Sequence, residues 1–261
     1  MDFESIMHLE SHGPDTFVGI GPSYPWGGLY GGQIVAQALR AALETVDPEL
    51  TVHSLHAYFI RLGNADEPIR FEVDRIRDGR TFSTRRVVAR QPAGAILNLA
   101  ASFQVHEEAP EVQTATMGDL PAPESLDSDP WSALFDKRWV SRYASPGRAI
   151  AWFRMNEPVG ADPALHACAL GYLSDDLPTD GVVAQHPDRP ERFDNDFPFW
   201  SASLDHAIWF HRPFRADEWH VHDFTCHGIM SSRGLAIGQI FTAAGEHVAT
   251  VAQEVLLRSR R

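Results

Sequence analysis

The sequence predicts an α+β fold made of two tandem units, each with one helix and an antiparallel sheet. Three observations lead to this prediction. A helix of mostly apolar and small residues comes before four strand-like runs. The turns between those runs are too short for parallel crossovers, which need a dozen or more residues. The second half of the chain also repeats the first at a fixed offset of 151 residues, which sets Phe59 against Phe210.

Residues 1–30 read as loops and lead to Gly31-Gly32. The next segment, 33–46, is expected to be helical, because Val35, Leu39 and Val46 follow helical spacing. Apolar or small residues cover most of its surface, so we expect other elements to enclose it. Pro48 ends it.

Four strand-like runs follow the helix. Turn residues separate them at Gly63-Asn64, Asp78-Gly79 and Pro92-Ala-Gly94. The expected strands cover residues 52–62, 68–77, 81–91 and 95–105. Such a run of hairpins is typical of an antiparallel sheet.

Residues 106–136 are rich in acids and proline, and they predict a linker draped over the surface. We therefore expect an N-terminal unit over 1–106, a linker over 107–136 and a C-terminal unit over 137–261. In the C-terminal unit, residues 149–155 read as a strand, and Asp162-Pro163 caps a short helix that runs through Tyr172. Residues 175–200 read as a long Pro- and Asp-rich connection. The remaining strands are expected over residues 203–211, 219–226, 232–242 and 247–257.

The repeat extends over the whole meander without a gap. At the offset of 151, Ala65-Asp66-Glu67 meets Ala216-Asp217-Glu218, and Ala93-Gly94 meets Ala244-Gly245. At the same register Ser54 meets Asp205, and Ser102 meets Gln253. A site used in only one copy would look like this, and so would drift between the copies.

Asp205 is a lone acid in a run that alternates like a strand. Leu204, Ile208 and Phe210 share one face, and Asp205 shares the other with Trp209. A carboxylate in such a run costs free energy to desolvate unless it has partners or a function. An acid at a strand end that faces water would give the same pattern.

The composition limits the classes of function. A chain of 261 residues with 44% hydrophobic residues is long and apolar enough for a sizeable core. Its formal charge of −13 argues against nucleic acid or anionic membrane as a partner. Two cysteines, no basic and apolar leader at the start and no membrane-length apolar run favour a cytoplasmic protein. The thirteen histidines show no metal-ligand spacing, so we expect no metal and no cofactor.

Several motifs, in order, resemble the acyl-CoA thioesterase II family, whose members have a double hotdog fold. The resemblance covers about residues 27–258, nearly the whole chain. The motifs are Gly31-Gly32-Gln33-Ile-Val-Ala-Gln-Ala-Leu, His53-Ser-Leu-His56-Ala-Tyr-Phe, Arg77-Asp-Gly-Arg-Thr-Phe-Ser-Thr-Arg-Arg86, Ala101-Ser-Phe-Gln104 and Leu204-Asp205-His206-Ala-Ile-Trp-Phe-His-Arg-Pro-Phe214.

The resemblance implies hydrolysis of fatty acyl-CoA without a metal or a covalent intermediate. In this family an aspartate, a hydroxyl and a glutamine activate water. The motifs imply that the aspartate is Asp205 and the glutamine is Gln253, and that the hydroxyl lies just before Arg233-Gly234. The hydroxyl position holds His227, a departure from the pattern, with Thr225, Ser231 and Ser232 as nearby hydroxyls. Gly31 and Gly32 are expected to bind substrate at a helix N-terminus. The expected partners are the acyl-CoA substrate and further copies of the chain.

Two other functions stay open at this point. If His227 blocks the water site, the chain is a silent acyl-CoA-binding protein. In the second alternative, the chain is a structural subunit of a larger hotdog assembly.

Overall fold

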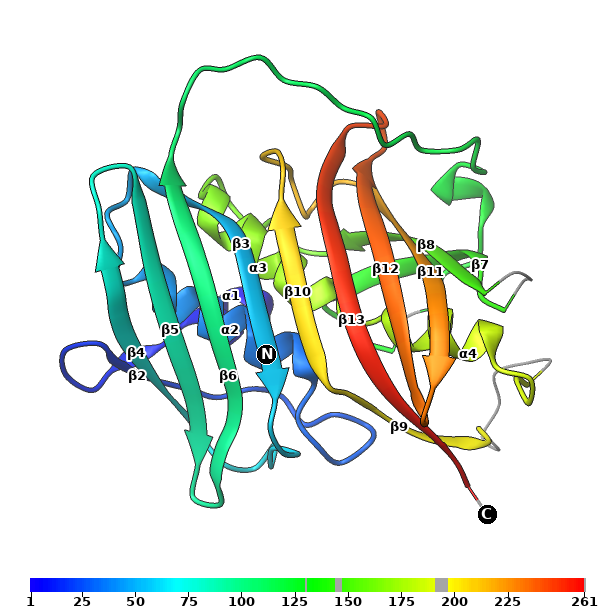
Figure 1. Cartoon of the computed structure of the whole chain (residues 1–261), viewed down its shortest axis with the longest axis horizontal. Coiled ribbons are helices and arrows are strands. Elements are labelled where there is room, and N and C mark those ends of the chain that lie inside the picture. Colours follow the sequence, from blue (N-terminus) through cyan, green and yellow to red (C-terminus); the bar gives the residue numbers. More distant parts are fainter. Residues whose placement is uncertain (130, 144–146, 191–196, 261) are drawn as a thin grey trace.

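The computed structural model describes residues 1–129, 131–143, 147–190 and 197–260, and one antiparallel sheet runs through it (Figure 1). The strand order is β1-β2-β4-β5-β6-β3-β10-β13-β12-β11-β8-β7, and β9 pairs with β13. The helices lie on one side of this sheet, which we call its inner face. The elements are α1 Phe3–Met7, β1 Glu10–Ser11, β2 Thr16–Gly19, α2 Gly31–Leu43, β3 Leu50–Phe59, β4 Ile69–Asp78, β5 Phe82–Gln91, β6 Gly94–Val105, the 3₁₀ turn η1 Pro123–Ser125, β7 Phe135–Ser141, β8 Arg148–Met155, α3 Pro163–Leu173, α4 Pro178–Gln185, β9 Phe199–Ser203, β10 Asp205–Phe210, β11 His220–Met230, β12 Arg233–Thr242 and β13 His247–Ser259.

The predicted repeat of a helix and four antiparallel strands is confirmed. In both halves the predicted strand runs appear, β3 to β6 and then β9/β10 to β13. The two halves join where β3 pairs with β10, antiparallel, with Ala57 opposite His206. The sheet therefore continues from one unit into the other without a free edge between them.

Helix α2 is enclosed, as its apolar surface predicts. Ten of its residues are buried, among them Gln33 and Gln37. These two amides satisfy each other and the chain around them: Gln33 Nε2 donates to Gln37 Oε1 at 3.1 Å, and Gln37 Nε2 donates to the Ile6 carbonyl at 2.9 Å. The helix is thus fixed along its length by buried hydrogen bonds as well as by packing.

The helix of the second unit is divided in two, which the sequence did not predict. Asp162 caps α3 as expected, accepting a hydrogen bond from the Ala164 N–H at 3.0 Å. However, α3 packs mainly against α2, and α4 is the helix that covers β11, β12 and β13. Helix α4 lies inside the segment predicted as a connection, 175–200, where Pro178 occupies its first turn. Residues 191–196 of that segment lie outside the described part of the chain.

The prediction that the offset of 151 residues holds without a gap is wrong for the last strand. On β6, Ser102 lies on the outer face, between the buried residues Ala101 and Phe103. Its partner in the sequence repeat, Gln253, is buried on the inner face of β13. The turn before β13 is longer than the turn before β6, so Gly238 pairs with Val251, one residue beyond the partner that the offset from the Val87–Leu99 pair predicts. A shift of one turns every side chain to the opposite face.

The acidic linker, over residues 106–129, lies mostly on the surface. It bows away from the end of β6 and returns along the second half of the sheet (Figure 1). Gln113 fastens it there: its Nε2 donates to the Gly245 carbonyl at 2.9 Å, and its Oε1 accepts from the His247 N–H at 2.8 Å. The N-terminal elements α1, β1 and β2 and the strand β7 were not predicted, because they are short or lie in proline- and acid-rich sequence.

Two buried histidines lie side by side in the core of the second unit. The rings of His220 and His222 are 5.1 Å apart, and His222 packs against Phe153 at 4.5 Å. Both nitrogens of His222 lack a hydrogen-bond partner in the described part of the chain. Burial lowers the pKa of His220 to about 4 and that of His222 well below its ordinary value.

We expect these histidines to make the fold sensitive to acid. Below about pH 6.5 the unfolded chain binds protons at them and the folded chain does not, so stability falls as the pH falls. Each histidine that stays neutral in the folded chain lowers the free energy of unfolding by about 2 kcal/mol when the pH falls from 7 to 5. His222→Phe should remove that share of the loss, as measured by urea unfolding at the two pH values. His227→Ala, at an exposed position, is the control. An equal loss in His222→Phe and wild type would contradict the prediction.

Candidate functional site

Asp175 is a buried carboxylate at the end of helix α3. It follows Ser174, which ends the helix, and only 7% of the residue is exposed. Burial raises the pKa of Asp175 to about 6, against hydrogen bonds from Ser203, Gln253 and a backbone N–H that lower it. A carboxylate with this proton affinity is suited to general-base catalysis near neutral pH.

Two donors from different parts of the chain hold this carboxylate. Ser203 Oγ, at the end of β9, donates to Asp175 Oδ1 at 2.9 Å. The N–H of Gly32, in the first turn of α2, donates to Asp175 Oδ2 at 2.9 Å. The carboxylate therefore lies against the positive end of a helix from the other unit, and the site lies where the two units meet.

Gln253 adds a side-chain amide to the same cluster. Its Nε2 donates to Ser203 Oγ at 2.8 Å, and its Oε1 contacts His206 Nδ1 at 2.5 Å. The other nitrogen of His206, Nε2, lies 2.8 Å from Ser174 Oγ. Gln253 and His206 are fully buried, on the inner faces of neighbouring strands. A carboxylate, a hydroxyl and an amide are thus joined by hydrogen bonds in one place.

The two glycines at the start of α2 permit this close approach. A Cβ atom added to Gly31 would lie 2.6 Å from Asp175 Oδ2. One added to Gly32 would lie 2.2 Å from the Tyr172 carbonyl oxygen. Neither position has room for a side chain, because Gly31 lies against the side chains of Asp175 and Phe59 and Gly32 lies against the backbone of α3.

Aromatic side chains and an ion pair form the wall next to the carboxylate. Tyr30 packs on Trp131 and Tyr172, with ring centroids 5.1 Å and 5.0 Å away. Asp176 accepts hydrogen bonds from Trp131 Nε1 at 2.8 Å and Lys137 Nζ at 3.0 Å. These contacts fix the turn after α3 and so the position of Asp175.

Asp205 lies outside this cluster. It is on the outer face of the sheet, opposite Tyr58, whereas Gln253 points to the inner face. Its Oδ1 accepts a hydrogen bond from the Glu254 N–H at 2.7 Å. Burial raises the pKa of Asp205, and the hydrogen bond from Glu254 opposes that effect. Because the sheet separates Asp205 from Gln253, the two side chains cannot bind one water molecule.

His227 is exposed, next to the irregularity between Cys226 and Gly228 in β11. The strand β12 lies between β11 and β13, so His227 is two strand spacings from Gln253, about 10 Å. Among the hydroxyls expected to replace it, Ser231 and Ser232 form the exposed turn after β11, with positive φ angles of 51° and 60°. Thr225 pairs with Ile237 and is half-buried.

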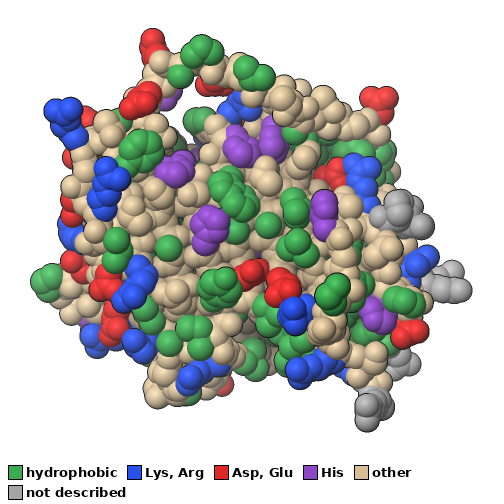
Figure 2. Space-filling model, in the orientation of Figure 1, with side chains coloured by type: hydrophobic (Ala, Val, Ile, Leu, Met, Phe, Trp, Pro, Cys, Tyr) green, Lys and Arg blue, Asp and Glu red, His purple; other side chains and the backbone are tan. Residues whose placement is uncertain are grey.

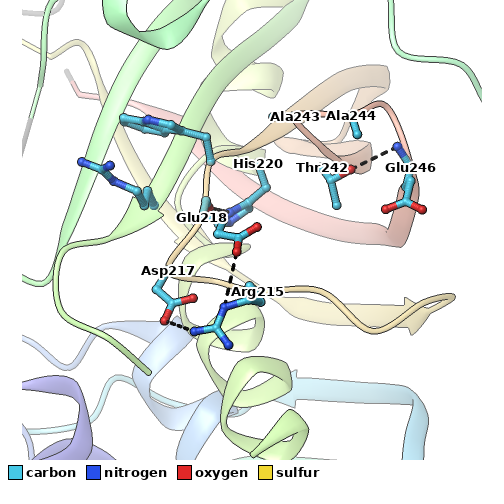
Figure 3. Close-up of a pocket in the computed structure, with 10 residues that line it drawn as sticks. Arg215, Asp217, Glu218, His220, Thr242, Ala243, Ala244 and Glu246 are labelled. Carbon is cyan, nitrogen blue, oxygen red and sulfur yellow. Dashed lines mark hydrogen bonds and ion pairs between the residues drawn. The ribbon is translucent and has the colours of Figure 1, made fainter. Parts of the chain in front are cut away.

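A surface pocket of about 500 Å³ lies elsewhere, beside the turns that begin β11 and β13 (Figure 3). Its Arg215 is already paired, at 2.7 Å with Asp217 and at 3.5 Å with Glu218. Gln253 is six residues along β13 from His247, roughly 20 Å away in an extended strand. The pocket therefore lies apart from the cluster around Asp175.

The cluster offers a base and hydrogen-bond donors for the activation of water. Among the residues that the structure describes, no group of three or more His, Cys, Asp or Glu side chains is arranged to hold a metal ion. Of the residues predicted from the sequence, the structure brings together Gln253, Gly31 and Gly32. Asp175 and Ser203 were missed. The available signal was Asp175-Asp176, two acids directly after an apolar helix, in a segment interpreted only as a connection.

Comparison with known proteins gives one consistent result. The family model described as the acyl-CoA thioesterase N-terminal domain matches residues 21–104, and the model of the C-terminal domain matches residues 107–257. Acyl-CoA thioesterase 2 of Haemophilus influenzae is 34% identical, over 88% of this chain and 87% of the relative. Human acyl-coenzyme A thioesterase 8 is 32% identical, over 97% and 88%. The crystal structure of acyl-CoA thioesterase II TesB2 from Mycobacterium marinum, 39% identical, superposes with a TM-score of 0.86 over 99% of this chain and 97% of that one.

Proposed function

The chain belongs to the acyl-CoA thioesterase family, and from this membership we infer that it hydrolyses acyl-CoA thioesters to a free acid and CoA. The fold is the double hotdog of that family. None of the helices in the described ranges is long and apolar enough to cross a membrane.

We propose that hydrolysis takes place at the cluster of Asp175, Ser203 and Gln253. The observation that carries this proposal is the chain of hydrogen bonds from Gln253 Nε2 through Ser203 Oγ to the Asp175 carboxylate. This cluster contains the three kinds of group that the family resemblance requires. It keeps Gln253 from the sequence prediction, and it replaces Asp205 by Asp175 and His227 by Ser203.

In the proposed reaction, ionised Asp175 takes a proton from a water molecule held by Ser203 and Gln253. The water oxygen attacks the thioester carbonyl carbon and forms a tetrahedral intermediate. The N-terminus of α2, beginning at Gly31, stabilises the negative charge on the carbonyl oxygen. The C–S bond then breaks, and the CoA sulfur receives the proton from Asp175.

The pH dependence of turnover tests this role of an ionised carboxylate. Activity requires deprotonated Asp175, whose pKa is about 6, so kcat/KM should fall tenfold for each pH unit well below 6. The measurement is CoA thiol release from acyl-CoA substrates of several chain lengths, at pH 4.5 to 8. Constant activity down to pH 5 would contradict the role of Asp175. If no substrate releases thiol, the chain is a silent binding protein.

We propose that copies of the chain associate through the outer face of the sheet. Tyr58 and Trp209 are 65% and 38% exposed there. Figure 2 shows hydrophobic and histidine side chains over the middle strands, with Lys and Arg mainly towards the edges. Exposed aromatic side chains gathered on one face of a sheet are typical of protein interfaces. A monomeric mass by light scattering would contradict this proposal.

We also propose a cytoplasmic location. It is supported by the two free cysteines, buried Cys168 and half-buried Cys226, because free thiols suit a reducing compartment.

A further inference from the structure

His206 lies behind the proposed catalytic groups, where it makes two hydrogen bonds to its neighbours. It is fully buried on β10, with Nδ1 2.5 Å from Gln253 Oε1 and Nε2 2.8 Å from Ser174 Oγ. A neutral imidazole has one donor nitrogen and one acceptor nitrogen, so its tautomer must match these two partners.

The direction of every hydrogen bond in this chain follows from the carboxylate. Ionised Asp175 can only accept, so the Ser203 hydroxyl spends its single proton on Asp175 Oδ1. Ser203 Oγ must then accept from Gln253, which requires the NH₂ group of the amide to face Ser203. The carbonyl oxygen of Gln253 consequently faces His206.

The same logic fixes the proton on His206. An amide oxygen needs a donor, so His206 carries its proton on Nδ1. Its Nε2 then accepts from the Ser174 hydroxyl. If the amide were reversed, its oxygen would compete with Asp175 for the one proton of Ser203. A single arrangement of protons therefore satisfies all five side chains, from Asp175 to Ser174.

We propose that His206, as the Nδ1–H tautomer held by Ser174, is a positioning residue that keeps the NH₂ group of Gln253 turned towards Ser203 and the attacking water. This proposal rests on the proposed function of Asp175, Ser203 and Gln253. Without the donor at Nδ1 the amide of Gln253 is free to reverse. The Ser203 proton would then be drawn away from Asp175, and the carboxylate would lose a hydrogen bond that stabilises its charge.

Burial supports a neutral ring at working pH, because it lowers the pKa of His206 to about 4. The titratable and charged groups near the ring are few. Asp175 lies beyond Ser203 and Gln253, and Asp205 and Glu254 point to the other face of the sheet.

Two substitutions separate the two nitrogens of His206. His206→Asn keeps an amide donor near the position of Nδ1. His206→Gln places its amide near the position of Nε2 and leaves no donor near Nδ1. We expect His206→Gln to lower kcat on the order of 10²-fold, the effect of misplacing a reacting group by about 1 Å, with little change in KM. His206→Asn should retain most of the activity.

The pH–rate profile gives a result that a merely structural role would not produce. In His206→Gln the acid limb should move above its position in wild type, because Asp175 has lost hydrogen-bond support from Ser203 and Gln253. In His206→Asn the limb should stay where it is. Equal loss in both variants with an unmoved limb would overturn the proposal.

Nitrogen NMR of histidine-labelled protein tests the tautomer without any activity measurement. Wild type should show His206 protonated on Nδ1 at pH 7, and Ser174→Ala should shift the population towards the Nε2–H form. A wild-type ring protonated on Nε2, or on both nitrogens, would overturn the proposal even if the variants fail to fold. If Asp175 is not the base, the activity measurements on the His206 variants fail, but the tautomer measured by NMR is unaffected. A failure of the proposed function is therefore distinguishable from a failure of the proposal for His206.

Discussion

Asp175→Asn should lower kcat by a factor on the order of 10² or more while the fold is kept, the scale expected for the loss of a general base. Asparagine is close to aspartate in shape, and its Oδ1 can still accept the hydrogen bond from the Gly32 N–H that Asp175 now accepts. It cannot take a proton from water. The acid limb of the pH–rate profile should disappear with the base, as measured by CoA thiol release.

The matched control is Asp205→Asn, at the acid that the sequence motif indicates. Asp205 lies on the outer face of the sheet, bonded to the Glu254 N–H, and asparagine can make the same bond. We expect turnover within about twofold of wild type, because the Asp205 side chain is half-exposed and its substitution leaves the cluster around Asp175 intact. If Asp205→Asn abolishes turnover and Asp175→Asn does not, the assignment made here is reversed.

Gly32→Ala should destabilise the protein more than alanine at any other glycine of the helices. The added Cβ would lie 2.2 Å from the Tyr172 carbonyl oxygen and 2.6 Å from Tyr30 Cε1. Because the first of these atoms belongs to the backbone of α3, the two helices must move apart. The expected cost is about 1–3 kcal/mol, the range for overpacking a core, and it should appear in urea unfolding.

A second helical glycine provides the control for this experiment. A Cβ on Gly171, in α3, would meet its first neighbour, Val35 Cγ1, at an ordinary 3.5 Å. Gly171→Ala should therefore be neutral or add up to about 1 kcal/mol, because alanine favours a helix. Movement of α2 in Gly32→Ala should also displace its N–H from Asp175, so turnover of the folded fraction should fall. Equal stability of the two variants would contradict the packing argument.

The sequence by itself determined helix α2, most of the strands of the two units and their repetition. Alternating residues and Gly-, Pro- and Asn-containing turns defined the strands, because period and turn chemistry are local properties. The fixed offset from Phe59 to Phe210 defined the two units, and the family motifs identified the activity. Within the site, the sequence predicted Gln253 and the two glycines of α2, whose residue types already suit hydrogen bonding and close approach.

Only the tertiary structure decided which acid and which hydroxyl join them. Asp175 meets the Gly32 N–H across 143 residues of sequence and Ser203 across 28, so local pattern says nothing about either contact. The choice also depends on a one-residue shift of β13 after its longer turn, which places Gln253 on the inner face, while Asp205 lies on the outer face of β10. A shift of one residue in a strand has almost no signature in the sequence, yet it reverses every side chain beyond it. For this reason the sequence indicated the chemistry of the site, and the packing of two helices against one sheet brought together the residues that we propose carry it.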